Sequence, residues 1–246
     1  MSTLADDSMS PAAGGLAVLA VRGPDAAKFL QGQLSADTEQ LAPGSSTLAG
    51  LHNPQGRVVA VLSISRTSPD EFLAALPREL VAAVAQRLRR FVLRSRVRIE
   101  EVPDAGPGQA SELEAVRQGV PQVYAATSEQ FVAQMLNLDL LGAIAFDKGC
   151  YTGQEVIARA HYRGRVKRRM QRWLNASGTE LKPGDNALGP DGRSLVIVRT
   201  APAGSGQELL AVGTFGDGAA VPAHAEGDAR GVMLSGPLPL PYELPG

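Results

Sequence analysis

The feature that most constrains the fold is a change in hydrophobic pattern after Gly164. Before it, short apolar runs alternate with segments in which apolar residues recur at helical spacing, as in residues 78–92. Beyond it, β-type segments are separated by the turn sequences KPGD, GPDG and AGSG. We therefore predict an α+β part, residues 1–165, followed by a small antiparallel β-barrel, residues 166–246.

The first part is expected to mix strands and helices. After a leader, residues 1–14, that we expect to be disordered, the run LAVLAV predicts a buried strand, and Pro24 and Asp25 suit the first turn of a helix. Apolar residues at helical spacing predict a further helix that begins at Arg78. The other expected elements are a hairpin around the turn NPQG, a third strand and a fourth strand (residues 47–66, 71–76 and 97–102).

Composition limits the possible partners and metals. The 246 residues carry a formal net charge of -1, which disfavours nucleic acid or anionic membrane as a partner over the whole surface. One cysteine excludes an intrachain disulfide, and three scattered histidines offer no zinc-type ligand spacing, so we predict no metal site. The N-terminus lacks the pattern of a signal peptide and no segment reaches membrane-spanning length, which favours a cytoplasmic location.

The octet KGCYTGQE, residues 148–155, contains the only cysteine, Cys150. Thr152 and Glu155 have the spacing of a capping box, which predicts that a helix begins there. The positive end of that helix and the ammonium of Lys148 would favour the thiolate form of Cys150. A lone cysteine is commonly a small buried hydrophobe, but this context favours a reactive thiol.

Several polar residues surround the octet. Gln134 and Asn137 lie in an apolar stretch, and their amides could read the edge of a nitrogen heterocycle or satisfy neighbouring backbone. Glu155 and Arg159 are four residues apart in the orientation that favours a surface salt bridge. We expect the apolar residues of the same helix to face the core (Val156, Ile157 and Ala160).

The stretch RGRVKRRMQR, residues 163–172, holds six basic residues and no acidic residue. Such a run could bind polyanions, either RNA phosphates or the polyglutamate tail of a folate. It could equally be a solvated strand face that protects a sheet edge. Both interpretations stay open from the sequence.

The segment QFVAQMLNLDLLGAIAFDKGCYTGQEVIARAHYRG resembles the signature of the folate-binding YgfZ family, relatives of the glycine-cleavage aminomethyltransferases. Further matching segments are VRGPDAAKFLQGQLSAD, HNPQGRVVA, LRRFVLRSRV and QGVPQVYAATSEQF, so the resemblance covers most of residues 16–170. It implies a tetrahydrofolate-binding α+β body of interleaved ferredoxin-like halves with a C-terminal β-barrel. The implied function is assembly or repair of iron–sulfur proteins, with tRNA modification among the associated processes.

The resemblance also implies site residues and partners. It makes Cys150 the essential thiol, with Lys148 beside it, and makes four polar residues candidates for lining a folate cavity or supporting its loop (Gln134, Asn137, Glu155 and Arg159). The expected partners are a reduced folate and iron–sulfur client proteins or assembly factors, without membrane or nucleic acid. We expect a monomer.

One departure from the wider superfamily bears on mechanism. Where aminomethyltransferases carry adjacent acidic residues after the hairpin turn, this chain has Ala60 and Val61. A general acid or base contributes about 10²–10⁴-fold to a rate, so its absence favours an accessory factor over a turnover enzyme. Two alternatives remain from the sequence: a folate-dependent one-carbon transferase, and an RNA-binding module that uses Arg163 to Arg172.

Overall fold

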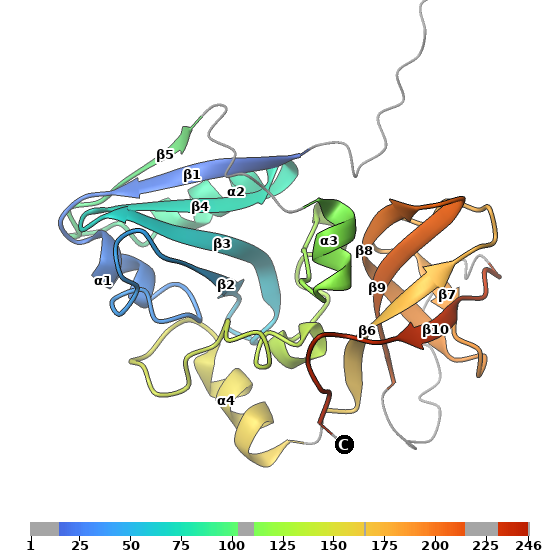
Figure 1. Cartoon of the computed structure of the whole chain (residues 1–246). Helices are drawn as coiled ribbons and strands as arrows, with labels where there is room; N and C mark the ends of the chain where they lie inside the picture. The colour runs from blue at the N-terminus through green and yellow to red at the C-terminus, as the bar shows by residue number, and fades with distance from the viewer. Residues whose placement is uncertain (1–14, 103–110, 165, 215–230, 246) are drawn as a thin grey trace, which may run out of the picture.

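The computed structural model describes residues 15–102, 111–164, 166–214 and 231–245. The leader 1–14, which we expected to be disordered, lies outside these residues. Two antiparallel sheets of five strands each form the body, and helix α3 (Glu112–Arg117) lies between them (Figure 1). The α+β class predicted from the hydrophobic pattern is confirmed. Among the residues described, no helix has the length and hydropathy needed to cross a bilayer.

The first sheet has the strand order β2-β3-β4-β1-β5. Its elements follow the predicted sequence of strands and helices closely. They are β1 (Leu16–Arg22), α1 (Ala26–Gln31), β2 (Ser46–His52), β3 (Val58–Ser68), β4 (Glu71–Pro77), α2 (Arg78–Arg89) and β5 (Arg98–Val102). Strand β1 lies between β4 and β5 and is buried along almost its whole length, and helix α2 covers one face of the sheet (Figure 1).

Helix α2 shows why its sequence forms this element and where the expectation was wrong. Its buried side chains recur at helical spacing and pack on β1, β4 and β5 (Leu80, Val81, Val84, Ala85 and Leu88). The helix ends at Arg89, whereas the apolar pattern predicted that it continues to Val92. Beyond its end, tighter backbone bonds run from the Phe91 N–H to the Leu88 carbonyl, and Phe91 is left 48% exposed.

The segment between the sheets contains the helix predicted after the octet and shorter helices that were not predicted from the sequence. Helix α3 begins at Ser111, whose hydroxyl oxygen accepts from the backbone N–H of Glu114. Two short 3₁₀ helices follow, η2 (Ala125–Thr127) and η3 (Ala133–Leu136), and then helix α4 (Gln154–Arg163). Ion pairs from α3 to the second sheet fix its position, Arg199 with Glu112 and Arg117 with Glu208.

The second sheet has the order β10-β6-β9-β8-β7 and is a curled half-barrel (Figure 1). Its strands are β6 (Arg168–Asn175), β7 (Asn186–Leu188), β8 (Ser194–Ala203), β9 (Gly206–Thr214) and β10 (Ser235–Leu238). Its own core is built around Trp173, with Leu181 and Ile197 among the buried neighbours. The proline-rich C-terminal stretch supplies the edge strand β10, a position in which proline is tolerated. The domain boundary near Arg165 stays a prediction.

A buried ion pair joins the two parts of the chain. Both guanidinium NH groups of Arg169, on β6, donate to the carboxylate of Asp139, at 3.0 and 2.9 Å. The two side chains are only 5% and 7% exposed. Arg169 also donates to the Asn137 side-chain oxygen and to the Gln134 carbonyl, which leaves the guanidinium well satisfied.

We expect Asp139→Ala to lower the free energy of unfolding by about 3–5 kcal/mol, because it leaves the Arg169 charge buried without its counter-ion. Urea denaturation followed by circular dichroism measures this change. The matched control is Glu100→Ala, which removes a surface partner of Arg22 and should cost less than about 1 kcal/mol. Equal losses in the two variants would contradict the structural importance of the buried pair.

Candidate functional site

Cys150 is displayed on a loop, residues 146–153, that leads into helix α4. The thiol-bearing residue is exposed, whereas Lys148 and Tyr151 on either side of it are buried, at 9% and 7% exposure. Gly149 has no atom within 4 Å of the place where a Cβ would stand. The thiol is therefore accessible, and the loop that carries it is fastened on both sides.

Lys148 anchors this loop to the segment that follows α1. Its Nζ donates to the carbonyl oxygens of Leu34, at 2.8 Å, and Ala36, at 2.7 Å. Burial lowers the pKa of Lys148 to about 8, because desolvation disfavours the ammonium form, while the carboxylates of Asp37 and Glu39 act in the opposite direction. The ammonium is thus bonded to two carbonyls of the loop's anchor segment. The role predicted for Lys148 beside the thiol stays a prediction.

The start of helix α4 differs from the expectation. Gly153, with φ 83°, is the N-cap residue, and no side chain caps the helix, so the capping box predicted for Thr152 and Glu155 is wrong. A Cβ added at Gly153 would lie 2.6 Å from the carbonyl oxygen of Asn53. The close approach to the β2–β3 turn, together with the left-handed backbone, explains why glycine occupies this position.

Helix α4 buries one residue and exposes its charged residues. Ile157 is 1% exposed, whereas Val156 is 41% exposed and lies over Gly56 in the hairpin turn, so the expectation that Val156 faces the core was wrong. Glu155 and Arg159 are both exposed. No ion pair joins these two described residues, and the salt bridge expected from their spacing is absent.

Aromatic rings hold the beginning of the loop against the end of α4. Phe146 stacks on His161 with the ring centroids 3.8 Å apart, and Tyr162 meets Phe146 edge-on at 6.0 Å. Together with the anchors at Lys148 and Gly153, this contact fixes the loop at three points around Cys150.

His52 is a buried residue that the sequence analysis did not identify as part of the site. It is fully buried, its ring centroid is 6.3 Å from that of Tyr151, and neither ring nitrogen has a hydrogen-bond partner among the described residues. Burial lowers the pKa of His52 to about 4, because the cationic form is desolvated. Its place at the end of a strand does not predict this burial, since Tyr151 and Gly153, which lie against its side chain, are distant in the sequence.

The two amides predicted to line a folate cavity differ in which hydrogen-bonding groups remain without a partner. Asn137 Nδ2 donates to the Met170 carbonyl and to the Tyr242 hydroxyl, and its oxygen accepts from Arg169. Gln134 Nε2 donates to the Ile157 carbonyl of α4, at 2.8 Å. Its Oε1 is buried and has no hydrogen-bond partner within the described part of the chain.

The basic run of residues 163–172 is not one continuous face. Arg169 is buried against Asp139, and Arg172 lies 3.9 Å from the carboxylate of Glu208. Arg165 lies outside the described residues. Polyanion binding, one of the two interpretations left open for this run, therefore cannot use Arg169, whose side chain is buried against Asp139.

Comparison with known proteins identifies the relatives of this chain. No protein-family model matches it. The tRNA-modifying protein YgfZ of Enterobacter sp. (strain 638) is 29% identical in an alignment that covers 69% of this chain and 75% of that protein. The YgfZ protein of Klebsiella pneumoniae (strain 342) is 28% identical with the same coverage. The chain is a distant homologue of the YgfZ tRNA-modifying proteins. The resemblance to YgfZ that KGCYTGQE indicated is thereby confirmed.

The fold has a solved counterpart. The glycine cleavage system aminomethyltransferase T of Bartonella henselae superposes with a TM-score of 0.64, covering 82% of this chain and 76% of that one. The sequences are 11% identical, so this likeness concerns the fold alone. The predicted aminomethyltransferase-like α+β fold is confirmed, and the YgfZ relationship gives the more specific comparison.

We expect Gly153→Ala to destabilise the protein by about 1–3 kcal/mol, since it strains a left-handed residue and drives a methyl group into Asn53. The same substitution at Gly149, which meets nothing within 4 Å, is the matched control and should have a small effect. Urea denaturation measures stability, and the rate of Cys150 alkylation reports whether the loop has moved. Equal behaviour of the two variants would show that Gly153 does not fix the helix start.

Stability should depend on pH through His52. Its folded pKa of about 4 lies below the ordinary histidine pKa of 6.5, so the unfolded chain binds the proton more readily between these values. The free energy of unfolding should therefore fall by a few kcal/mol as the pH drops from 6.5 to 4. In His52→Leu this pH-dependent fall in the free energy of unfolding should be missing. Denaturation at a series of pH values measures it, with each protein compared with itself at pH 7. Parallel pH profiles for the two proteins would contradict this assignment.

Proposed function

We propose that this chain is a reduced-folate-binding accessory protein that maintains iron–sulfur enzymes, including enzymes that modify tRNA, and that it acts through Cys150. The observation that carries the proposal is the exposed thiol held on a loop that is anchored at three points. The distant homology to YgfZ tRNA-modifying proteins and the aminomethyltransferase-like fold support it.

The residues near the loop differ in how many groups they have available to bind a folate. Gln134 offers a buried, unpartnered amide oxygen, which could accept from an N–H of a pteridine ring. The side-chain groups of Asn137 are committed to protein partners, so we assign it a supporting role. Arg159 is exposed and could pair with a carboxylate of the glutamate tail, while Glu155 could accept from folate N–H groups. When bound, a reduced folate supplies a ring that can carry a one-carbon unit.

The residues of β3 favour an accessory role over aminomethyl transfer. Ala60 and Val61 stand where acidic residues assist transfer in aminomethyltransferases, and both are fully buried apolar residues. Neither can exchange a proton with a substrate. A transferase that uses another group is the alternative that the aminomethyltransferase-like fold favours, and transfer of a labelled carbon from an amine donor to tetrahydrofolate would support it.

Cys150 limits what the protein can do with an iron–sulfur cluster. A cluster held permanently by protein generally needs four ligands, and one thiol cannot supply them. Among the described residues, no three His, Cys, Asp or Glu side chains are grouped so that they could hold a metal ion. We therefore assign Cys150 the role of a transient thiol or of one ligand shared with a client protein.

The remaining expectations complete the proposal. We propose a folate-binding domain of interleaved ferredoxin-like halves up to residue 165 and a C-terminal barrel beyond it. The hydrogen bonds between Leu188 and residues 232–234 support the barrel, because they link β7 to the segment that leads into β10. A monomer in the cytoplasm fits this role.

Calorimetric titration with tetrahydrofolate under anaerobic conditions tests the proposal. We expect wild type and Cys150→Ser to bind equally, and Gln134→Ala to bind roughly tenfold more weakly, because it removes the free acceptor at a cost of about 1–2 kcal/mol. In cells that lack the endogenous protein, Cys150→Ser should fail to restore the activity of an iron–sulfur tRNA-modifying enzyme. Full rescue by Cys150→Ser would contradict the thiol role, and absence of folate binding by folded wild type would contradict the folate role.

A further inference from the structure

The segment that joins α2 to β5 concentrates positive charge at the surface. Residues 87–98 contain six arginines and no acidic residue. Arg87 and Arg89 are engaged internally, since they donate to the carbonyls of His52 and Ile99. Arg90 and Arg94 are exposed, and their guanidinium groups have no carboxylate or hydrogen-bond partner among the described residues. These two cations are free to bind an external anion.

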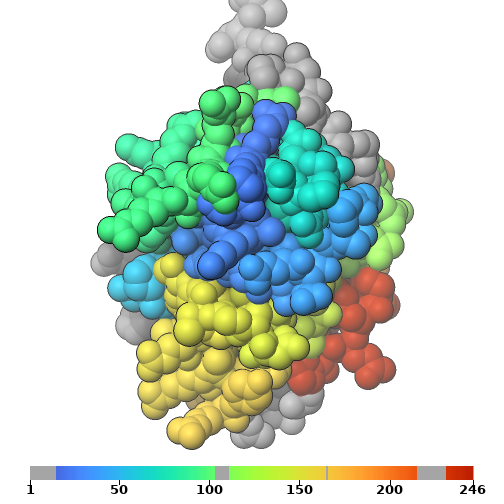
Figure 2. Space-filling model, turned by 90° about the vertical axis from the view of Figure 1, so that its left-hand side faces the viewer, coloured from blue at the N-terminus to red at the C-terminus, as the bar shows by residue number. Residues whose placement is uncertain are grey.

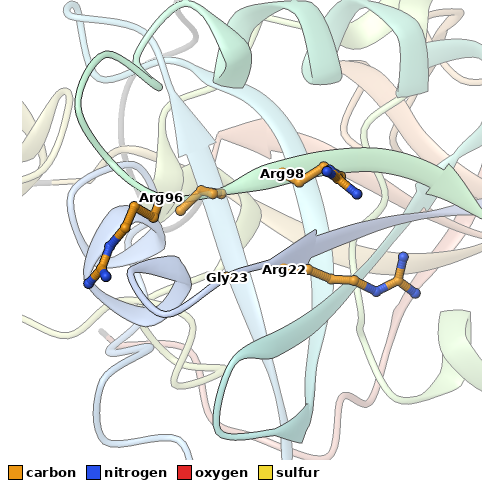
Figure 3. Close-up of a pocket in the computed structure, with 5 residues that line it drawn as sticks. Arg22, Gly23, Arg96 and Arg98 are labelled. Atoms are coloured by element: carbon orange, nitrogen blue, oxygen red, sulfur yellow. The ribbon is translucent and has the colours of Figure 1, made fainter.

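Further along the same segment, Arg96, Val97 and Arg98 line a hollow of about 370 Å³ together with Arg22 and Gly23 (Figure 3). Arg22 and Arg98 stand opposite each other on β1 and β5, and their side chains extend in the same direction. Like charges in this position repel, and carboxylates of Glu71 and Glu100 reduce the repulsion. Arg96 extends toward α1 and pairs with Asp25, yet its side chain is 76% exposed.

Two apolar side chains stand exposed between the free arginines. Phe91 is 48% exposed and Leu93 is 85% exposed. Figure 2 shows the end of α2 and the following residues beside β1 and α1 on one face of the molecule. A surface that alternates guanidinium groups with an accessible aromatic ring suits a chain of phosphates whose unpaired bases can stack.

We propose that this surface, formed by Arg90, Phe91, Arg94, Arg96 and Arg98, binds single-stranded RNA. The free guanidinium groups of Arg90 and Arg94 pair with phosphates, Arg96 and Arg98 border the hollow that receives the backbone, and Phe91 stacks on a base. A chain of carboxylates without aromatic groups would use the charges but not the ring. The net charge of -1 for the whole chain is compatible with such a local site.

This inference goes beyond the folate and thiol site. None of its residues belongs to the loop of Cys150 or to the amides at Gln134 and Asn137. It also differs from RNA binding through residues 163–172, where Arg169 is buried. The two basic stretches therefore provide a matched comparison.

Fluorescence anisotropy with a labelled mixed-sequence RNA of about 15 nucleotides tests the site, at potassium chloride from about 50 to 200 mM. R90Q/R94Q should weaken binding at least about tenfold at the lowest salt, and the salt dependence of log K should fall by about 1.4 for the two lost contacts. F91A should weaken binding about fivefold or more through lost stacking. The control R163Q/K167Q removes the same charge from exposed residues and should bind within about twofold of wild type.

Several results would overturn the proposal. One is the absence of RNA binding by wild type at the lowest salt, and another is an equal loss of affinity in R90Q/R94Q and R163Q/K167Q. A third is that polyglutamate of equal length competes as strongly as unlabelled RNA, which would indicate an acidic protein partner. Tetrahydrofolate titration of R90Q/R94Q separates this site from the folate site, because that variant should bind folate as wild type does.

Discussion

The structure depends on the buried ion pair between Arg169 and Asp139. Through Arg169 it holds the first strand of the second sheet, and the neighbouring Asn137 bonds to the Met170 backbone and to Tyr242 of the C-terminal segment. Gln134, whose carbonyl accepts from the same guanidinium, reaches helix α4 through its amide. A buried charged pair is stable only when its hydrogen-bonding groups are paired. Pairing these groups fixes the position of the two parts of the chain relative to each other.

The loop of Cys150 combines unfavourable and favourable interactions that together hold one accessible thiol. Burial of the Lys148 ammonium is unfavourable, and two backbone carbonyls offset part of the desolvation. Gly153 accepts a backbone conformation that other residues resist, and Phe146 closes the far end by stacking on α4. A thiol presented in this way keeps its orientation while a partner approaches, so less ordering is required on binding.

Much of the fold could be predicted because its signals are local. The strands of the first sheet are short apolar runs between turn sequences, and α2 has an apolar face at helical spacing. Ser111 and Glu114 also form a local signal for α3, because the Ser111 hydroxyl caps the helix by accepting from the Glu114 N–H. By contrast, the burial of His52 and the inward direction of Arg169 arise from partners distant in the chain. The false capping box at Thr152 shows the same limit, since Gly153 is selected by contact with Asn53.

The distribution of two rare side chains has a practical consequence. The chain has one tryptophan, Trp173, buried in the core of the second sheet, and one cysteine, Cys150, exposed on the loop beside the first part. The indole is therefore a single fluorescent donor, and the thiol is a single attachment point for an acceptor dye. Energy transfer between them would follow movement of the loop relative to the second sheet in the unsubstituted protein, without any engineered label site.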